Sequence, residues 1–144
     1  MLLILVSVFC TAFLAATILP FSSELVVATA MADESVHLVA LWASATAGNT
    51  LGAVVNYWLG RGATRYQDKQ WFPASQTQMN KAEAWFNRYG IWSLLLTWIP
   101  IGGDALTVIA GILRIRLDIF VIFVGLGKGA RYAVVIAGLD ALLF

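Results

Sequence analysis

The stretch TWIPIGGD, Thr97 to Asp104, decides how we expect this chain to fold. It places a proline, two glycines and a carboxylate in the middle of an apolar run from Ile91 to Leu113. A proline removes a helical hydrogen bond, and a carboxylate is costly at the centre of a bilayer. Since an uninterrupted membrane helix would avoid both, the pattern predicts that the run is broken at its centre.

A second stretch, TILPFSSE from Thr17 to Glu24, aligns with the first without a gap at an offset of 80 residues. Threonine aligns with threonine, proline with proline, and Glu24 with Asp104. We interpret the two stretches as copies of an internal repeat and predict a break of the helix in each. The residues that we expect at these breaks are Pro20, Ser22, Ser23, Pro100, Gly102 and Gly103.

The composition is that of a polytopic membrane protein. Of the 144 residues, 60% are hydrophobic and 12% are charged, which is too little polar surface for a water-soluble globule. The nine basic residues are spread over several short loops and the net charge is +1, so we expect no nucleic acid partner. One cysteine and one histidine give no disulfide framework and no metal-binding cluster, and we expect no cofactor.

Three apolar segments have lengths that bear on the topology. Leu2 to Leu19 is long enough either to cross the membrane or to form one limb of a re-entrant hairpin. Val36 to Leu59 and Asp118 to Leu139 are full spans by length. An acidic turn, Ala32 to Ser35, separates the first hairpin from the first span and should lie in water.

The first span carries small or polar residues at a strict spacing of four, which places them on one helical face. These residues are Gly48, Gly52, Asn56 and Gly60. In lipid such a face lets a second backbone approach closely, and an asparagine can hydrogen-bond across the contact. We therefore predict helix packing here. The alternative is that Asn49 or Asn56 also contacts a substrate or an ion.

The segment from Gly60 to Tyr89 is the long polar stretch of the chain and contains several lysines and arginines. By the positive-inside rule it should be cytoplasmic. Apolar residues recur at helical spacing in its second half, with charged residues elsewhere on the helical wheel. We expect a short amphipathic helix on the inner membrane surface.

The run from Ile91 to Leu113 could be a single span, but Arg88 precedes it and Arg114 and Arg116 follow it. Because both ends then prefer the cytoplasm, a re-entrant hairpin fits better. The predicted fold is an all-α integral membrane protein with two inverted repeats, each a re-entrant helical hairpin plus a transmembrane helix. Repeat one covers about residues 2–60, the amphipathic linker about 61–90 and repeat two about 91–144 of a single transmembrane domain.

Four ionisable residues fall within the predicted membrane segments: Glu24, Asp104, Lys128 and Arg131. Each costs at least about 2.5 kcal/mol in a bilayer, so they are candidates for function. We expect Glu24 and Asp104 to exchange protons or couple to an ion, and Lys128 and Arg131 to bind an anion. The second limb of each hairpin should begin near Ser22 in the first repeat and near Gly103 in the second. The positive end of its helix dipole should then face a cavity between the half-helices. The alternative is that these groups form ion pairs that only hold the fold together.

These motifs resemble the DedA superfamily (SNARE-associated Golgi protein, or VTT, domain), and its short YqaA-like branch. Leu19 to Glu24 is similar to the proline-containing, acid-ended first hairpin of that family. Gly52 to Arg61 resembles its glycine-rich span, and Lys81 to Gly90 resembles its amphipathic lead-in. Pro100 followed by Ala110-Gly111 has the spacing of its second hairpin.

The resemblance implies movement of lipids across membranes, including polyprenyl phosphate carriers in bacteria and phospholipids in eukaryotic relatives, with proton or sodium coupling. Glu24 is the position that best matches a functional residue of the family. The two arginines that the family has around its second proline are Thr97 and Gly103 here, so their phosphate-binding role does not carry over. We expect Lys128 and Arg131 to supply that positive charge from the last span.

We therefore predict a DedA-type transporter or flippase of the bacterial inner membrane that moves a lipid phosphate or a related amphiphile. A homo-oligomer is compatible with this reading. The alternative is a non-transporting membrane-integrity or assembly factor whose buried charges are structural. An enzyme is the third reading and we expect none, because Ser22 and Ser23 lack a nearby base and are better explained as helix caps.

Overall fold

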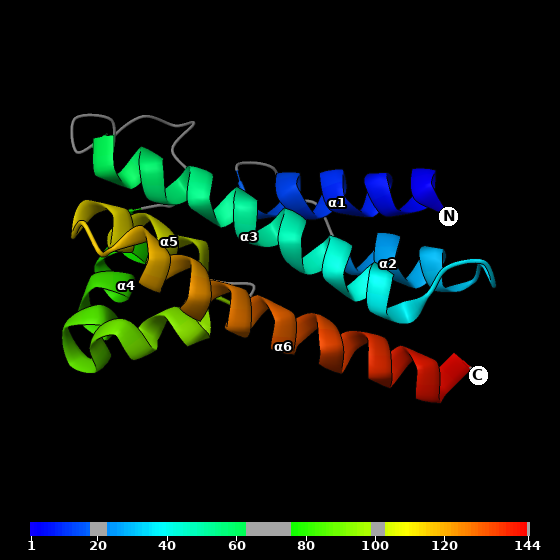
Figure 1. Ribbon diagram of the computed structural model, residues 1–144. Coiled ribbons are helices and arrows are strands. Elements are labelled where there is room, and N and C mark those ends of the chain that lie inside the picture. The colour runs from blue at the N-terminus through cyan, green and yellow to red at the C-terminus, as the bar shows by residue number, and fades with distance from the viewer. Residues whose placement is uncertain (18–22, 63–75, 99–102, 144) are drawn as a thin grey trace.

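The protein is all-helical in its computed structural model (Figure 1). The structure describes residues 1–17, 23–62, 76–98 and 103–143, apart from the side chains at positions 76, 78, 79, 82, 98, 103 and 104. The elements in these ranges are α1 (Leu2–Ala16), α2 (Ser23–Met31), α3 (Leu38–Gly62), α4 (Gln76–Tyr89), the 3-10 helix η2 (Gly90–Trp98), α5 (Gly103–Ile112) and α6 (Leu117–Leu143).

Two of the described helices, α3 and α6, are long and apolar enough to cross a membrane. They correspond to the spans predicted from Val36 to Leu59 and from Asp118 to Leu139. They lie side by side and run in opposite directions, and the Trp42 indole N–H donates to the carbonyl of Gly129 at 2.8 Å across their contact (Figure 1). These two helices form the axis against which the shorter elements pack.

The short elements form two groups at opposite ends of this axis (Figure 1). Helices α1 and α2 run antiparallel to each other beside the N-terminal and middle parts of α3. The group of α4, η2 and α5 lies around the C-terminal end of α3 and the N-terminal half of α6. Both chain termini and the α2–α3 turn lie at one end of the molecule, and the α5–α6 turn lies at the other.

The contact between α1 and α3 is a close backbone approach. A Cβ atom placed on Gly48 or on Gly52 would overlap the carbonyl of Phe9 or of Phe13 on α1. Contact at this range, without intervening side chains, is what small residues allow in membrane helix pairs. The predicted stripe of small residues therefore faces α1 at these two positions.

The contact between α3 and α5 is also a close backbone approach, and each of the two helices contributes a glycine to it. A Cβ atom on Gly60 would overlap the Val108 carbonyl, and one on Gly111 would overlap the Tyr57 carbonyl. Tyr57 is fully buried, and its ring lies 4.8 Å from the ring of Phe120. The Tyr57 hydroxyl donates to the carbonyl of Ile115 and so links α3 to the α5–α6 turn.

The ends of α4 and α5 are explained by the backbone conformation of the residues that follow them. Gly90 has a φ of 61°, a left-handed conformation that terminates α4. At the end of α5, Arg114 is left-handed with a φ of 56°. The Ile115 amide donates to Ala110 and the Arg114 amide to Gly111, both at 3.1 Å, which is a Schellman motif. This motif ends α5 and begins the α5–α6 turn, which contains Arg114 and Arg116.

The segment expected to be the first limb of the second hairpin is a 3-10 helix instead of an α-helix. Its nine residues make it unusually long, because such helices rarely exceed three or four residues. Two hydroxyls accompany this geometry: Ser93 donates to the Trp85 carbonyl at 3.1 Å, and Thr97 donates to the Leu94 carbonyl at 2.8 Å. At about 2.0 Å per residue η2 is about 18 Å long, longer than the same number of residues in an α-helix.

Helix α4 occupies the second half of the predicted polar segment. Phe86 is buried, whereas Lys81, Glu83, Trp85 and Arg88 are exposed. Among the side chains of α4 that the structure describes, Phe86 contacts the bundle and the charged residues lie away from it.

Candidate functional site

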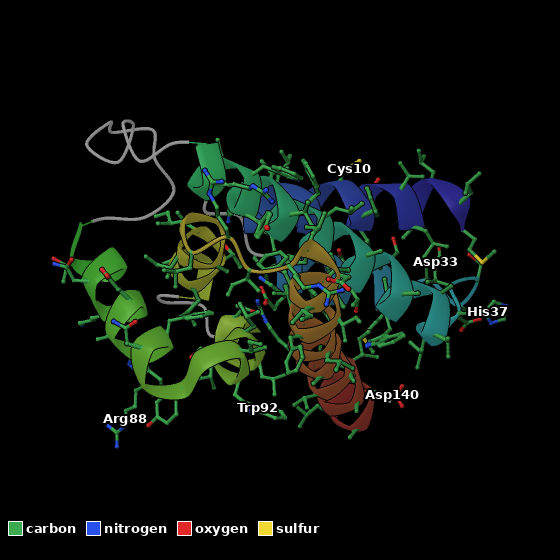
Figure 2. All side chains as sticks on the ribbon, turned by 60° about the vertical axis from the view of Figure 1, so that its left-hand side comes forward. Cys10, Asp33, His37, Arg88, Trp92 and Asp140 are labelled. Atoms are coloured by element: carbon green, nitrogen blue, oxygen red, sulfur yellow. The ribbon has the colours of Figure 1, made fainter. Side chains whose placement is uncertain are left out.

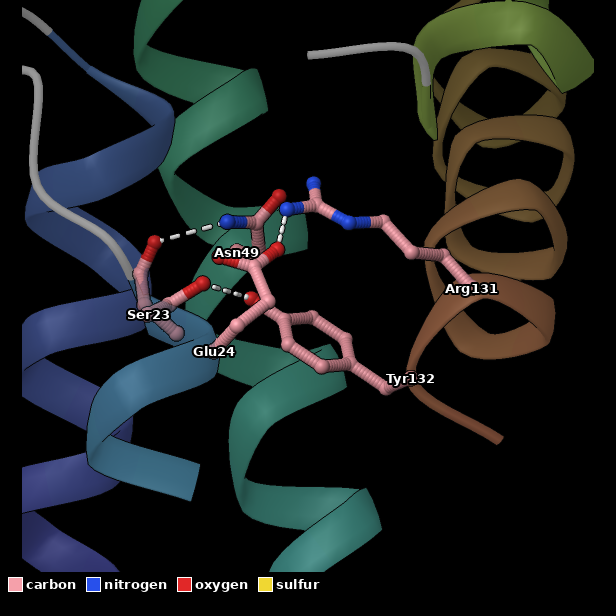
Figure 3. Close-up of polar contacts among 6 residues, drawn as sticks. Ser23, Glu24, Asn49, Arg131 and Tyr132 are labelled. Carbon is pink, nitrogen blue, oxygen red and sulfur yellow. Dashed lines mark hydrogen bonds and ion pairs between the residues drawn. The ribbon is translucent and has the colours of Figure 1, made fainter. Parts of the chain in front are cut away.

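The candidate site is where the first turn of α2 meets the middle of α6 (Figure 3). The Glu24 carboxylate forms an ion pair with the Arg131 guanidinium. The hydroxyls of Ser23 and Tyr132 share a hydrogen bond of 2.7 Å. Two consecutive residues of α2 are therefore joined to two consecutive residues of α6.

The ion pair is largely withdrawn from the surface. The Arg131 side chain is 18% exposed and the Glu24 side chain is 33% exposed. Ser23 and Tyr132 are almost completely buried, at 2% and 0%. An ion pair at this depth has less competition from water than a surface pair, so its charges interact strongly.

The start of α2 explains the position of the carboxylate. Helix α2 begins at Ser23, so Glu24 lies in its first turn. The unpaired N–H groups of a helix N-terminus favour a negative charge there. From the sequence, helical segments are expected to begin near Ser22 and Gly103, and in the structure α2 begins at Ser23 and α5 at Gly103.

Asn49 of α3 forms a third side of the site. Its side chain is 2% exposed, and its Nδ2 donates to the Ala12 carbonyl of α1 at 2.9 Å. Figure 3 shows the Asn49 amide beside the ion pair, with its oxygen on the side of the Arg131 guanidinium. Within the described part of the chain, this oxygen, Oδ1, has no hydrogen-bond partner.

Lys128 lies three residues before Arg131 on α6 and is 2% exposed. That spacing is close to one helical turn, so the two cations lie on neighbouring positions of one helical face. A lysine at this level of burial keeps its charge only with polar or anionic groups near it. One face of α6 therefore carries the buried Lys128 and the partly buried Arg131, which pairs with Glu24.

Several predicted site residues lie outside the described part of the structure: Pro20, Ser22, Pro100 and Gly102. The backbone of Asp104 is described, as the second residue of α5, but its side chain is not. The role expected for Asp104, proton exchange or ion coupling together with Glu24, therefore stays a prediction.

The predicted packing residues of α3 lie along its contacts with two different helices. Gly48 and Gly52 face α1, as described above, and Asn56 donates to the Ala16 carbonyl of α1 at 2.7 Å. Gly60, the last of the four, faces α5 instead. Like Asn49, Asn56 has no hydrogen-bond partner for Oδ1 among the described residues.

Ionisable side chains outside the bundle lie at both of its ends. Figure 2 shows Asp33 and His37 at the end opposite to Arg88. Asp33 accepts hydrogen bonds from the hydroxyl and the amide of Ser35, at 2.6 and 2.9 Å, and these bonds hold the pKa of its carboxyl below the ordinary value. At the other end, Arg116 pairs with Asp118 at 2.8 Å on the exposed α5–α6 turn.

Sequence reasoning missed Tyr132 as a member of the site. Its signal in the sequence is weak, because a tyrosine in a membrane helix is usually explained as an interfacial anchor. A tyrosine directly after an arginine within an apolar span is the feature that could have drawn attention to it. Ser23 was expected as a helix break and a helix cap, whereas its hydroxyl bonds to Tyr132.

The fold and the site together define a class: an all-α membrane protein with a partly buried ion pair between a short helix and a long apolar helix. The VTT domain family model matches residues 2–140, and the chain belongs to this family. It is similar to the inner membrane protein YqaA of Escherichia coli K12 and to that of Shigella flexneri. Each is 39% identical over 135 residues, which cover 92% of this chain and 89% of the relative.

An uncharacterized protein of Haemophilus influenzae is 35% identical over 131 residues, which cover 86% of this chain and 80% of that protein. No solved structure matches the chain. The family and its relatives agree with the resemblance found in the sequence, to the DedA superfamily and its YqaA-like branch. The protein is located in the bacterial inner membrane.

Proposed function

We propose that the protein is a transporter or flippase that moves a lipid phosphate or a related amphiphile across the inner membrane. The observation that carries the proposal is the Glu24–Arg131 ion pair between α2 and α6. A cation held inside the bundle by a carboxylate is a ready site for an anionic headgroup, provided that the carboxylate can release it. Intramembrane charges of this kind usually mark a substrate or proton path.

The proposed mechanism uses exchange of partners at Arg131. While Glu24 is ionised, it occupies Arg131 and keeps the site closed. Protonation of Glu24 removes its attraction for the guanidinium, so an anion can take its place, with Lys128 adding a second positive charge nearby. Release of the proton restores the ion pair and expels the anion. Asp104 is the proposed counterpart of Glu24 in the second repeat, with a proton or sodium ion as the coupling ion.

The proposed architecture is a pair of inverted repeats, each a re-entrant hairpin followed by a span. Three features support it. Helices α1 and α2 reverse direction without crossing the length of α3 (Figure 1). Gly48 of α3 lies against the Phe9 carbonyl of α1, and Gly127 of α6 lies against the Leu95 carbonyl of η2, so each span contacts its own first limb through a glycine. The second limbs, α2 and α5, begin at positions that are 80 residues apart.

The proposed orientation places the Gly60–Tyr89 segment in the cytoplasm, with α4 at the inner membrane surface. Support comes from the basic residues near this end of the molecule and from the acidic turn at the opposite end (Figures 1 and 2). Arg61 lies at the C-terminal end of α3, Arg88 in the last turn of α4, and Arg114 and Arg116 in the α5–α6 turn. The partners that we propose are membrane lipids, such as a polyprenyl phosphate or a phospholipid, and no nucleic acid. The mechanism needs binding and release but no catalytic step.

The proposal is tested in proteoliposomes that contain hexadecyl phosphate in both leaflets. External alkaline phosphatase hydrolyses the outward-facing phosphates, so lipid movement raises the hydrolysed fraction above the share of the outer leaflet. We expect movement with the wild type and none with Glu24→Gln or Arg131→Ala, although both variants insert. Arg116→Ala, which changes an exposed arginine outside the site, is the matched control and should be active. Normal movement in both site variants would refute the proposal.

A second candidate function is a membrane-integrity or assembly factor without transport. It is favoured by the double link between α2 and α6, because an ion pair and a hydrogen bond at neighbouring residues are also what a structural clasp requires. The exchange Glu24→Arg with Arg131→Glu distinguishes the two. A clasp should regain its stability and its cellular phenotype when the charges are exchanged, whereas a transport site should regain stability alone.

A further inference from the structure

Asn49 presents an unsatisfied hydrogen-bond acceptor to the candidate site. Its Nδ2 donates to the Ala12 carbonyl at 2.9 Å, and a carbonyl accepts only from the amino side of an amide. This bond therefore fixes which side of the amide is oxygen. Oδ1 must face away from α1 and toward the ion pair, as Figure 3 shows.

This oxygen is buried and has no partner among the described residues, in a side chain that is 2% exposed. A buried acceptor without a donor destabilises a protein, so such atoms usually have a bound partner in the working state. The oxygen lies beside Arg131, the cation that the proposed transport mechanism gives to the substrate. The missing partner is therefore expected to be a donor on a molecule that also carries a negative charge.

Among anionic lipid headgroups, the singly protonated phosphate monoester has both properties. Its ionised oxygens match an arginine, and its remaining P–OH group is a hydrogen-bond donor. A phosphate diester has the charge but no P–OH, and a sulfate or a fully ionised phosphate also has no donor. Lone pairs of such an anion would face the lone pairs of Asn49 Oδ1.

We infer that Asn49 selects singly protonated phosphate monoesters, because its Oδ1 accepts a hydrogen bond from P–OH while Arg131 binds the ionised oxygens. This inference rests on the proposed transport function and adds the headgroup class that the site prefers. Asn49 is a specificity-determining residue in this account. Ser23 and Tyr132 hold α2 against α6 and so keep the first turn of α2 beside Arg131.

The matched control is Asn56, one of the other polar residues of α3. Its Nδ2 donates to an α1 carbonyl, that of Ala16, at 2.7 Å, and its Oδ1 is also unpartnered among the described residues. It lies seven residues from Asn49, which is about 10 Å along a helix. Replacing Asn56 should therefore reproduce the structural loss of the α1 contact without affecting the anion.

The test compares binding of hexadecyl phosphate and of its diester, hexadecyl methyl phosphate, to the protein in lipid nanodiscs. At about pH 5 both lipids carry about one negative charge, because the second pKa of a phosphate monoester is about 6, and only the monoester has a P–OH group. We expect the wild type and Asn56→Leu to bind the monoester about tenfold more tightly, since one buried acceptor is left unpaired by the diester. In Asn49→Leu the two affinities should become nearly equal.

Equal affinities in the wild type, or an unchanged preference in Asn49→Leu, would overturn the inference and leave transport by Arg131 untouched. Failure of both lipids to bind the wild type would overturn the proposed function as well. The wild-type comparison needs no variant, so the test holds even where Asn49→Leu does not fold.

Competition by inorganic phosphate identifies the source of the headgroup. Displacement of the lipid at similar concentrations indicates a free anion, and no displacement at thousandfold excess indicates a lipid. In the first case sulfate must compete more weakly than phosphate.

Discussion

Replacing Gly52 by alanine should open the contact between α1 and α3. The new Cβ would lie 2.7 Å from the Ala16 Cβ and 2.5 Å from the Phe13 carbonyl oxygen. Because carbon atoms normally approach to about 3.5–4.0 Å, the helices must separate by about 1 Å. Such a shift would lengthen the Asn56 to Ala16 hydrogen bond from 2.7 Å to beyond hydrogen-bonding range.

The expected fall in the free energy of unfolding can be worked out from these contacts. Overpacking of this kind costs about 1–3 kcal/mol, and each hydrogen bond between membrane helices contributes about 0.6–1 kcal/mol. Since Asn49 and Asn56 both bond to α1, we expect the free energy of unfolding to fall by about 2–5 kcal/mol. Unfolding in bicelles, followed by tryptophan fluorescence, measures this change.

Gly138→Ala is the matched control, because a Cβ at that position of α6 meets no atom within 4 Å. An alanine there should leave stability unchanged or raise it by up to about 1 kcal/mol, through its higher helix propensity. Equal stability of Gly52→Ala and Gly138→Ala would refute the close approach of α1 to α3.

Three further predictions concern single interactions. Tyr132→Phe removes the hydroxyl that bonds to Ser23, and should lower the free energy of unfolding by about 1 kcal/mol in the same unfolding assay, with no change if that bond is absent. The depressed pKa of Asp33 means that its bonds from Ser35 stabilise the folded state above the ordinary aspartate value of 3.8 and are lost as pH falls through the lower folded-state pKa. The difference in melting temperature between wild type and Asp33→Asn should therefore shrink at acid pH, and a constant difference would contradict this. Arg116→Ala breaks a largely exposed ion pair, so its melting temperature should stay close to that of the wild type.

The long helices could be predicted from the sequence because their signal is strong. An apolar run of more than 18 residues fits a bilayer in one conformation, and α3 and α6 are found where two such runs occur. The observed ends of α3 and α6 differ from the predicted ends by only a few residues, because local capping interactions decide where a helix ends. The conformation of η2 could not be predicted, because the apolar pattern of Ile91 to Trp98 fits a 3-10 helix and an α-helix equally.

The candidate site could be predicted in part. A charge within an apolar segment is visible in any sequence, so Glu24 and Arg131 could be chosen without a structure. Which residues of α6 reach the start of α2 depends on the rotation of that helix about its axis, and the sequence carries no direct signal for it. The acceptor on Asn49 depends on which way its amide is turned, and the bond to Ala12 fixes this.

The central claim is that Arg131 is an anion site which Glu24 closes. The most direct test is the affinity of hexadecyl phosphate for wild type and for Glu24→Gln in nanodiscs at neutral pH. Glutamine keeps the size of the side chain but no longer competes for the guanidinium through a charge. We therefore predict tighter binding in Glu24→Gln than in the wild type. Weaker binding in the variant, or no binding in either protein, would contradict the account.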